Sequence, residues 1–139
     1  MTLSDPELAI AAAKAGAAVV RARYGESLAR FDKSPTDFAT LADIEAEKAI
    51  LDVLRTARPE DALLGEESGY HGPYRADRTW LVDPLCGSLH YAARTALVAV
   101  NVALRTGKDI QVAASADPLS AELFLDRREA RLCPSQRRG

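Results

Sequence analysis

Residues 80–88 read WLVDPLCGS, and this stretch decides how the chain is expected to fold. Its first three residues form a short apolar run that closes on Asp83-Pro84, as a buried strand does before a turn. A second run, Ala-Leu-Leu at residues 62–64, closes in the same way on Gly65-Glu66-Glu67-Ser68. The two runs therefore predict two short buried strands, each with a carboxylate at its end, where a rigid sheet can aim it.

Two helices are predicted before these strands. Ser4 and Glu7 form a capping box that begins the first helix, which is expected to end near Gly25. Residues 30–40 are polar and contain a proline, so they are expected to form a loop or a hairpin. Apolar residues then recur at helical spacing from residue 41 until Pro59 ends the pattern. The expected apolar face of this second helix comprises Leu41, Ile44, Ile50, Leu51, Val53, Leu54 and Ala57.

Further strands are predicted in the second half of the chain. The valine-rich run at residues 97–104 is expected to be a buried central strand. Turn-forming residues at 106–109 precede an alternating segment at 110–114, and a second turn precedes the apolar run at 122–125. Residues 70–73, between the two acid-bearing turns, are expected to be an exposed loop.

Two helices followed by several strands predict an α/β fold of the layered, α+β kind, with N-terminal helices packed on a mostly antiparallel sheet. The chain has 139 residues, enough for one domain with a hydrophobic core, expected to span residues 1–126. The remaining segment, residues 127–139, is rich in arginine and lacks periodicity, so it is predicted to be a polar, flexible tail.

The composition argues against several classes of partner. Hydrophobic residues make up 47% and charged residues 27% of the chain, and its formal net charge is −2. This balance predicts neither nucleic acid nor a membrane as a partner. The N-terminus lacks the basic start of a signal peptide, so we expect a cytoplasmic protein. The two cysteines cannot form a disulfide framework or a four-cysteine zinc site.

The carboxylates at the two predicted strand ends suggest a metal site. Hard divalent cations such as Mg²⁺ prefer oxygen ligands and keep some of their waters. Glu66 and Asp83, aimed from neighbouring strand ends, supply such ligands. Either acid alone reads as a solvated turn residue, and it is the pair that favours a metal.

Three segments together resemble the inositol monophosphatase family, whose members hydrolyse small phosphate esters. Residues 33–43, KSPTDFATLAD, resemble the family's opening motif, in which a threonine–x–alanine–aspartate leads into a helix. Residues 65–68 resemble its glycine–glutamate–glutamate turn. Residues 80–88 resemble its tryptophan–x–x–aspartate–proline–x–aspartate–glycine–threonine signature. The order and spacing match the N-terminal half of the family's sugar-phosphatase fold.

The resemblance implies a metal site on four residues. Glu66 and Asp83 would bind metal through their carboxylates, and Leu85 through its main-chain carbonyl. Cys86 takes the position of the second signature aspartate, also a metal ligand in the family. The implied cofactor is Mg²⁺, with Mn²⁺ as an alternative and Zn²⁺ if Cys86 is a ligand, because a thiolate suits softer metals.

The resemblance also implies catalytic and phosphate-binding roles. Asp43 and Ser88, the latter in place of the family's threonine, would orient and deprotonate the attacking water. Gly87 and Ser88 would offer backbone N–H groups to the substrate phosphate. Lys33 and Glu67 are candidates for supporting contacts around the metal ligands.

Cys86 leaves the activity open. A nucleophilic cysteine of the phosphatase-loop type needs an arginine six residues later, and that place holds Ala92. We therefore interpret Cys86 as a small buried residue in a degraded site, in preference to a nucleophile. His90 and His71 receive no catalytic role.

Two functions remain open from the sequence. The first is a Mg²⁺-dependent phosphomonoesterase with an incomplete metal site, whose substrate is a small phosphorylated compound such as inositol monophosphate. The alternative is a catalytically weak or inactive relative that acts as a ligand-binding or protein-interaction module. The family's second half carries a tryptophan–aspartate–x–x–alanine–glycine motif, absent here because Trp80 is the only tryptophan. Two alternatives are expected, namely a shortened member of the family or a sequence that stops before the second half. The resemblance also implies a homodimer.

Overall fold

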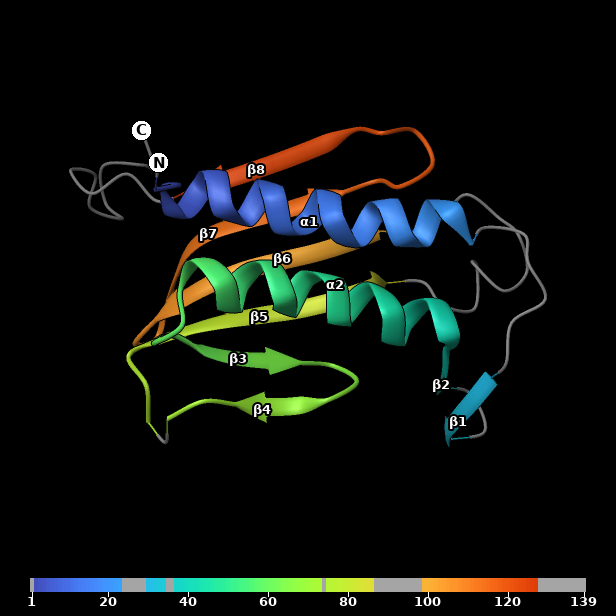
Figure 1. Ribbon diagram of the computed structural model, residues 1–139, viewed down its shortest axis with the longest axis horizontal. Helices are drawn as coiled ribbons and strands as arrows, with labels where there is room; N and C mark the ends of the chain where they lie inside the picture. Colours follow the sequence, from blue (N-terminus) through green and yellow to red (C-terminus); the bar gives the residue numbers. More distant parts are fainter. Residues whose placement is uncertain (1, 24–29, 35–36, 74, 87–98, 128–139) are drawn as a thin grey trace, which may run out of the picture.

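Two helices lie side by side on one face of a six-stranded sheet in the computed structural model (Figure 1). The model describes residues 2–23, 30–34, 37–73, 75–86 and 99–127. The helices are α1 (Asp5–Ala22) and α2 (Leu41–Ala57). This arrangement confirms the predicted layered α/β fold. Among the described helices, none combines the length and apolar character needed to cross a bilayer.

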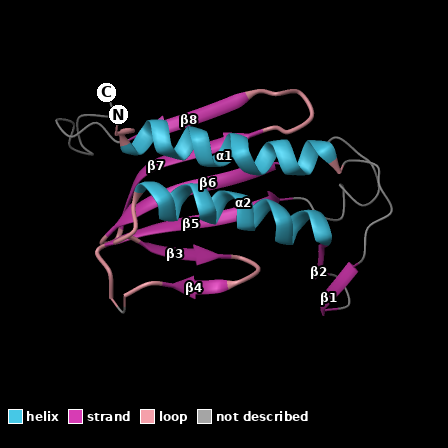
Figure 2. Cartoon of the chain, in the orientation of Figure 1, coloured by secondary structure: helices cyan, strands magenta, loops and turns pink. Residues whose placement is uncertain are grey.

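The sheet is mixed, with strand order β4-β3-β5-β6-β7-β8. Only β3 and β5 pair in parallel, and the other neighbours are antiparallel (Figure 2). A separate antiparallel hairpin, β1 with β2, precedes α2, as the hairpin alternative for residues 30–40 predicts. The strands are β1 (Arg30–Ser34), β2 (Asp37–Thr40), β3 (Ala62–Gly65), β4 (Gly69–His71), β5 (Arg78–Cys86), β6 (Ala99–Thr106), β7 (Asp109–Ala116) and β8 (Leu123–Arg127).

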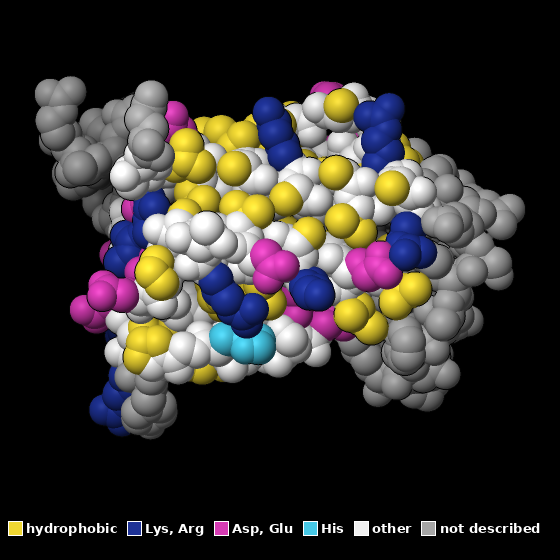
Figure 3. Space-filling model, in the orientation of Figure 1, with side chains coloured by type: hydrophobic (Ala, Val, Ile, Leu, Met, Phe, Trp, Pro, Cys, Tyr) yellow, Lys and Arg dark blue, Asp and Glu magenta, His cyan; other side chains and the backbone are white. Residues whose placement is uncertain are grey.

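The core lies between the helices and the sheet. Alternate residues of β6 and β7 are buried, which is the period expected of strands with one face against a core. Trp80 on β5 is fully buried among them, and its indole Nε1 donates to Asp61 Oδ2 at 2.9 Å. The outer surface of the helix layer carries basic and acidic side chains interspersed among apolar ones (Figure 3).

Three sequence predictions need correction. Residues 69–71 form β4 instead of part of a loop, because β3 needs only a short turn to reverse into a hairpin. Strand β5 does not end at Asp83 but continues to Cys86. Its register with β6 shifts between these residues, and this irregularity accommodates Pro84, which has no N–H to donate. Ile44, expected on the apolar face of α2, is 40% exposed.

The first helix begins as the capping box predicts. Ser4 Oγ accepts a hydrogen bond from the Glu7 amide at 3.2 Å, and the Ser4 amide donates to Glu7 Oε1 at 2.9 Å. Further along, Gly16 lets α1 lie close to α2. A Cβ at this position would stand 2.6 Å from Ile50 Cδ1 and 3.0 Å from Val100 Cγ1.

We therefore expect Gly16→Ala to lower the free energy of unfolding by up to about 2 kcal/mol. Alanine favours a helix over glycine by about 1 kcal/mol, but overpacking a core costs about 1–3 kcal/mol. Urea unfolding measures the difference. Ile50→Val removes the Cδ1 atom, so it should be better tolerated in the Gly16→Ala background than alone. An increase in stability on Gly16→Ala would contradict the close approach.

A cluster of ion pairs ties the start of α1 to the end of α2 and to the sheet. Arg78 donates to Asp5 Oδ1 at 2.9 Å and to Asp61 Oδ1 at 3.0 Å. Arg58 donates to the same Asp5 oxygen at 3.0 Å. The hydrogen bond from Arg78 is the main reason that the pKa of Asp5 lies below its ordinary value of 3.8.

Asp5→Asn should destabilise the chain by about 1 kcal/mol at neutral pH. Because the folded-state pKa of Asp5 is lowered, its contribution is present above pH 3.8 and is lost as the pH falls through the folded-state value. In urea unfolding, the difference in unfolding free energy between wild type and Asp5→Asn should narrow between pH 7 and about pH 3. The exposed Glu60, changed to glutamine, is the control. A gap that is constant with pH would show that the Asp5 carboxylate is not ionically engaged.

Candidate metal and phosphate site

The parallel register of β3 and β5 brings the two predicted acidic turns together. Gly65 lies opposite Val82, and the Glu66 amide donates to the Val82 carbonyl at 3.1 Å. Glu66 and Asp83 are the next residues on the two strands. Glu66 follows the end of β3, whereas Asp83 lies within β5, three residues before that strand ends at Cys86. The register brings the two acids to neighbouring positions, but the prediction that each stands at a strand end holds only for Glu66.

Glu66 and Asp83 line one groove of about 710 Å³. The groove lies on the face of the sheet opposite the helices, since its lining includes the strand residues that alternate with those buried under α1 and α2. Its floor is largely apolar, and Glu66 and Asp83 stand at the β3–β5 side. The residues that line it are Leu64, Gly65, Glu66, Leu81, Val82, Asp83, Asn101, Val102, Ala103, Ala113, Ala114, Ser115, Phe124, Leu125 and Asp126.

One carboxylate oxygen in this groove lacks a partner. Asp83 Oδ1 is buried and accepts no hydrogen bond from the described part of the chain. A buried carboxylate oxygen without a donor is costly, and a cation is one of the few groups that satisfies it. The donor set, two hard carboxylates, suits Mg²⁺ or Mn²⁺. Within the described residues, however, no group of three or more His, Cys, Asp or Glu side chains is placed to hold a metal.

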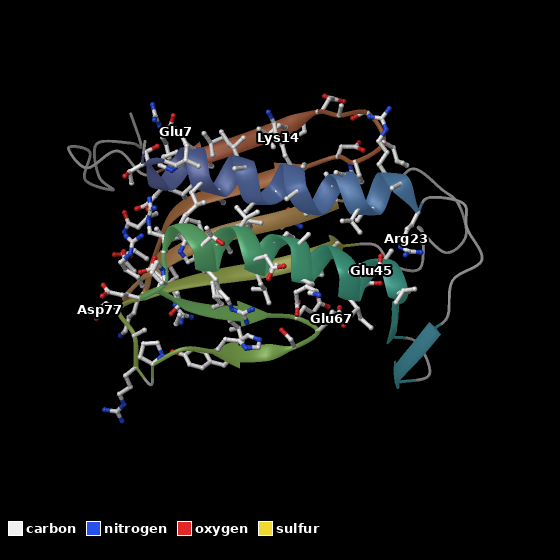
Figure 4. All side chains as sticks on the ribbon, viewed as in Figure 1. Glu7, Lys14, Arg23, Glu45, Glu67 and Asp77 are labelled. Atoms are coloured by element: carbon white, nitrogen blue, oxygen red, sulfur yellow. The ribbon has the colours of Figure 1, made fainter. Side chains whose placement is uncertain are left out.

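The turn that carries Glu66 rests on a buried glutamate that sequence reasoning missed. Glu47 on α2 is 2% exposed, and its carboxylate accepts the amides of Glu67 at 2.9 Å and Ser68 at 2.8 Å. Figure 4 shows Glu67 at this turn, beside α2. The available signal was spacing, because Glu47 follows Asp43 by one helical turn and both fall among the buried positions of α2.

The other predicted site residues are distributed as follows. Asp43 is 1% exposed in the first turn of α2, at the end of the molecule where β3 and β5 also end (Figure 1), and it is not among the described residues that line the groove. Leu85 and Cys86 continue β5, with Cys86 opposite Ala99. Lys33 lies in β1. Gly87 and Ser88, with His90 and Ala92, lie outside the described residues.

The sheet and its two covering helices are those of one phosphatase family. The model of the inositol monophosphatase family matches residues 5–134, and the chain belongs to this family.

Relatives of known name agree with this assignment. Nus factor SuhB of Salmonella typhimurium is 33% identical over 119 residues, which cover 84% of this chain and 45% of that protein. Inositol-1-monophosphatase of Caulobacter vibrioides is 39% identical over 93 residues, or 66% of this chain and 36% of that protein. The crystal structure of the extragenic suppressor protein SuhB from Bartonella henselae superposes with a TM-score of 0.81 at 35% identity, over 87% of this chain and 48% of that one. The chain thus spans about half the length of these relatives or less.

The unpartnered oxygen makes Asp83→Asn informative. In the metal-free chain this change should leave the free energy of unfolding within about 1 kcal/mol of wild type, because Oδ1 accepts no hydrogen bond from the described residues. Mn²⁺ should raise the melting temperature of wild type and not of the variant. Asp52→Asn, on the exposed face of α2, is the control. A loss of several kcal/mol in the metal-free variant would show that Asp83 has a structural partner instead.

Proposed function

We propose that this chain supplies the metal-binding carboxylates of a metal-dependent phosphomonoesterase that hydrolyses inositol phosphate or a similar small phosphate ester. The observation that carries the proposal is the presence of Glu66 and Asp83 in one groove, where the buried Asp83 Oδ1 atom accepts no hydrogen bond from the described residues. Membership of the inositol monophosphatase family supports the reaction class.

In this proposal Glu66, Asp83 and the Leu85 carbonyl hold Mg²⁺ or Mn²⁺, both of which accept all-oxygen ligand sets. When bound, the metal would supply Lewis-acid stabilisation of the phosphate and lower the pKa of a bound water. Cys86 stands where an aspartate would complete the set, and a thiol contributes little to a magnesium site. Metal binding is therefore expected to be weaker than with a full set of carboxylates.

The remaining roles follow the residues' chemistry. Asp43 is a buried carboxylate on α2. It is proposed to pair with the Ser88 hydroxyl, so that the two groups orient and deprotonate the attacking water. Backbone N–H groups of Gly87 and Ser88 are proposed to bind the phosphate oxygens. Lys33 and Glu67 are proposed to make supporting contacts around the metal ligands.

Isothermal titration of the chain with Mg²⁺, Mn²⁺ and Zn²⁺, each with and without inorganic phosphate, tests the proposal. Binding of Mg²⁺ or Mn²⁺ that strengthens in the presence of phosphate is the expected result, because phosphate would complete the metal's ligand shell. Binding of no metal, or of Zn²⁺ alone, would rule the hydrolase function out.

Replacement of the cysteine tests the incomplete site. Cys86→Asp restores a hard oxygen ligand and should raise the Mg²⁺ affinity about 10-fold or more. Cys86→Ser, similar in size to cysteine and without a carboxylate, is the matched control and should raise it far less. Equal Mg²⁺ titrations for all three proteins would show that position 86 does not face the metal.

A binding function is the second candidate, and the groove favours it. Phe124, at its rim on β8, is 62% exposed, and Leu64 and Leu125 are 38% and 39% exposed. Exposed apolar residues gathered in one hollow mark an interaction surface. We propose a second copy of this chain as the occupant, which agrees with the homodimer that the resemblance implies. That several relatives are named Nus factor SuhB is a further reason to consider a role outside hydrolysis.

Phe124→Asp tests the dimer. A charge at this exposed position should convert a dimer into a monomer, because burying an unpaired carboxylate in an apolar interface is costly. Sedimentation velocity of both proteins gives the oligomeric state. The control is Ile110→Asp, which changes another exposed apolar residue, 46% exposed and outside the groove lining. A wild-type monomer, or a dimer that survives Phe124→Asp, would contradict this candidate.

A further inference from the structure

The carboxylate of Glu47 is buried directly beneath the turn that carries Glu66. We propose that Glu47 is a positioning residue, which fixes the turn of residues 65–68 and so aims the Glu66 carboxylate toward Asp83 on β5. The inference rests on the proposed metal-dependent function, because its purpose is to pre-form the site for a cation. Glu47 itself would not touch the metal, and it is absent from the described lining of the groove.

The hydrogen bonds of Glu47 show how the turn is held. One carboxylate oxygen accepts the Glu67 amide at 2.9 Å, and the other accepts the Ser68 amide at 2.8 Å. Hydrogen bonds to an ionised acceptor are stronger than those between neutral groups. Two consecutive amides held by one rigid carboxylate fix the peptide planes just after Glu66. The backbone of Glu66 is fixed on its other side by the bond from its amide to the Val82 carbonyl.

Gly65 completes the arrangement by leaving room for Glu47. A Cβ at residue 65 would stand 2.5 Å from Glu47 Cδ and within 2.7 Å of both carboxylate oxygens. Gly65 is not among the glycines with positive φ, so its backbone conformation does not require glycine. Glycine is needed here because any larger residue would collide with the Glu47 carboxylate. The glycine of the Gly-Glu-Glu turn is therefore explained by the close approach of the α2 carboxylate.

The charges indicate why such a clamp is needed. Glu66 and Glu67 are adjacent acids, and Glu47 adds a third carboxylate close to the turn. Like charges held together repel each other, so an unsupported turn would relax and spread them apart. A cation bound by Glu66 and Asp83 offsets that repulsion. A turn fixed beforehand avoids the ordering cost that would otherwise weaken metal binding.

Glu47→Gln is the sharpest single change. The glutamine side chain keeps the shape, but its NH₂ group must face one of the two amides, so at most one hydrogen bond survives. The expected result is that hydrogen exchange at the Glu67 and Ser68 amides speeds up by about 10- to 100-fold. The Mn²⁺ dissociation constant should rise by roughly 10- to 100-fold. Exchange at the core amides of Val102 and Leu104 monitors the fold and should stay unchanged.

Glu45→Gln is the matched control on the same helix. Glu45 pairs with Arg23, which Figure 4 shows next to it, and the Arg23 Nη2 atom donates to it at 2.8 Å. Its replacement should leave the two turn amides and the Mn²⁺ affinity within about 2-fold of wild type, because Glu47 accepts those amides and a partly exposed ion pair is weak.

A double-mutant cycle tests the coupling between Gly65 and Glu47 even if Glu47→Gln perturbs the structure beyond the turn. Gly65→Ala alone should weaken Mn²⁺ binding as Glu47→Gln does, because the new Cβ displaces the carboxylate. In the Glu47→Ala background, Gly65→Ala has no carboxylate to displace, so it should weaken Mn²⁺ binding little further. Additive effects of the two changes would overturn the proposed coupling between Gly65 and Glu47.

The measurements separate failure of this inference from failure of the proposed function. Unchanged exchange at the Glu67 and Ser68 amides in Glu47→Gln, or unchanged Mn²⁺ affinity, overturns the positioning role while the metal site stands. Absence of Mn²⁺ binding to the unaltered chain overturns the proposed function and the metal-directed role with it. In that case the exchange rates still decide whether Glu47 holds the turn.

Discussion

The parallel pairing of β3 with β5 is the constraint on which the rest of the site depends. It is the one parallel pairing in the described sheet, and both strands run in the same direction, so that the end of β3 lies beside Val82 of β5. An antiparallel pairing would place the residue after Gly65 at the opposite end of β5 from Asp83. Because the register sets Gly65 against Val82, the next residues on each strand are two carboxylates. Strands β6, β7 and β8 extend the sheet on the far side of β5 and form the floor of the groove.

The helix layer supports that strand edge from behind. Helix α2 lies over the sheet and supplies Glu47, whose carboxylate binds the turn after β3. Gly16 lets α1 approach α2, and the ion pairs of Asp5 with Arg58 and Arg78 join the start of α1 to the end of α2 and the start of β5. The helices thereby fix the backbone around the site from one face, while the site itself opens on the other.

Much of the fold could be predicted because its signals are local. The capping box at Ser4, the helical spacing after residue 41 and the alternation in β7 each need only a few neighbouring residues. The strand β4 was missed because three residues carry no usable period. The extent of β5 was missed because Pro84 usually ends a strand, whereas here an irregularity in the ladder accommodates it.

The candidate site was predictable only in part. Its two strand-end acids follow visible apolar runs, so Glu66 and Asp83 could be named from the sequence. The role of Glu47 could not, because an acid on a helix reads as solvated unless the partner that buries it is known. The partner is a turn 20 residues away, and its contact with Glu47 exists only once α2 packs on the sheet. The groove likewise joins residues from five strands and has no sequence signature.

The central claim, that the ends of β3 and β5 form one cation site, is tested most directly by paramagnetic Mn²⁺ in amide NMR spectra of the chain. Mn²⁺ broadens signals only close to where it binds. At low Mn²⁺ concentration the account predicts loss of the Glu66 and Asp83 amide signals first, with those of Gly65 and Val82 close behind, while those of Asp109 and Glu122 persist. Broadening that begins at Asp109 or Glu122, or no selective broadening at all, would contradict it.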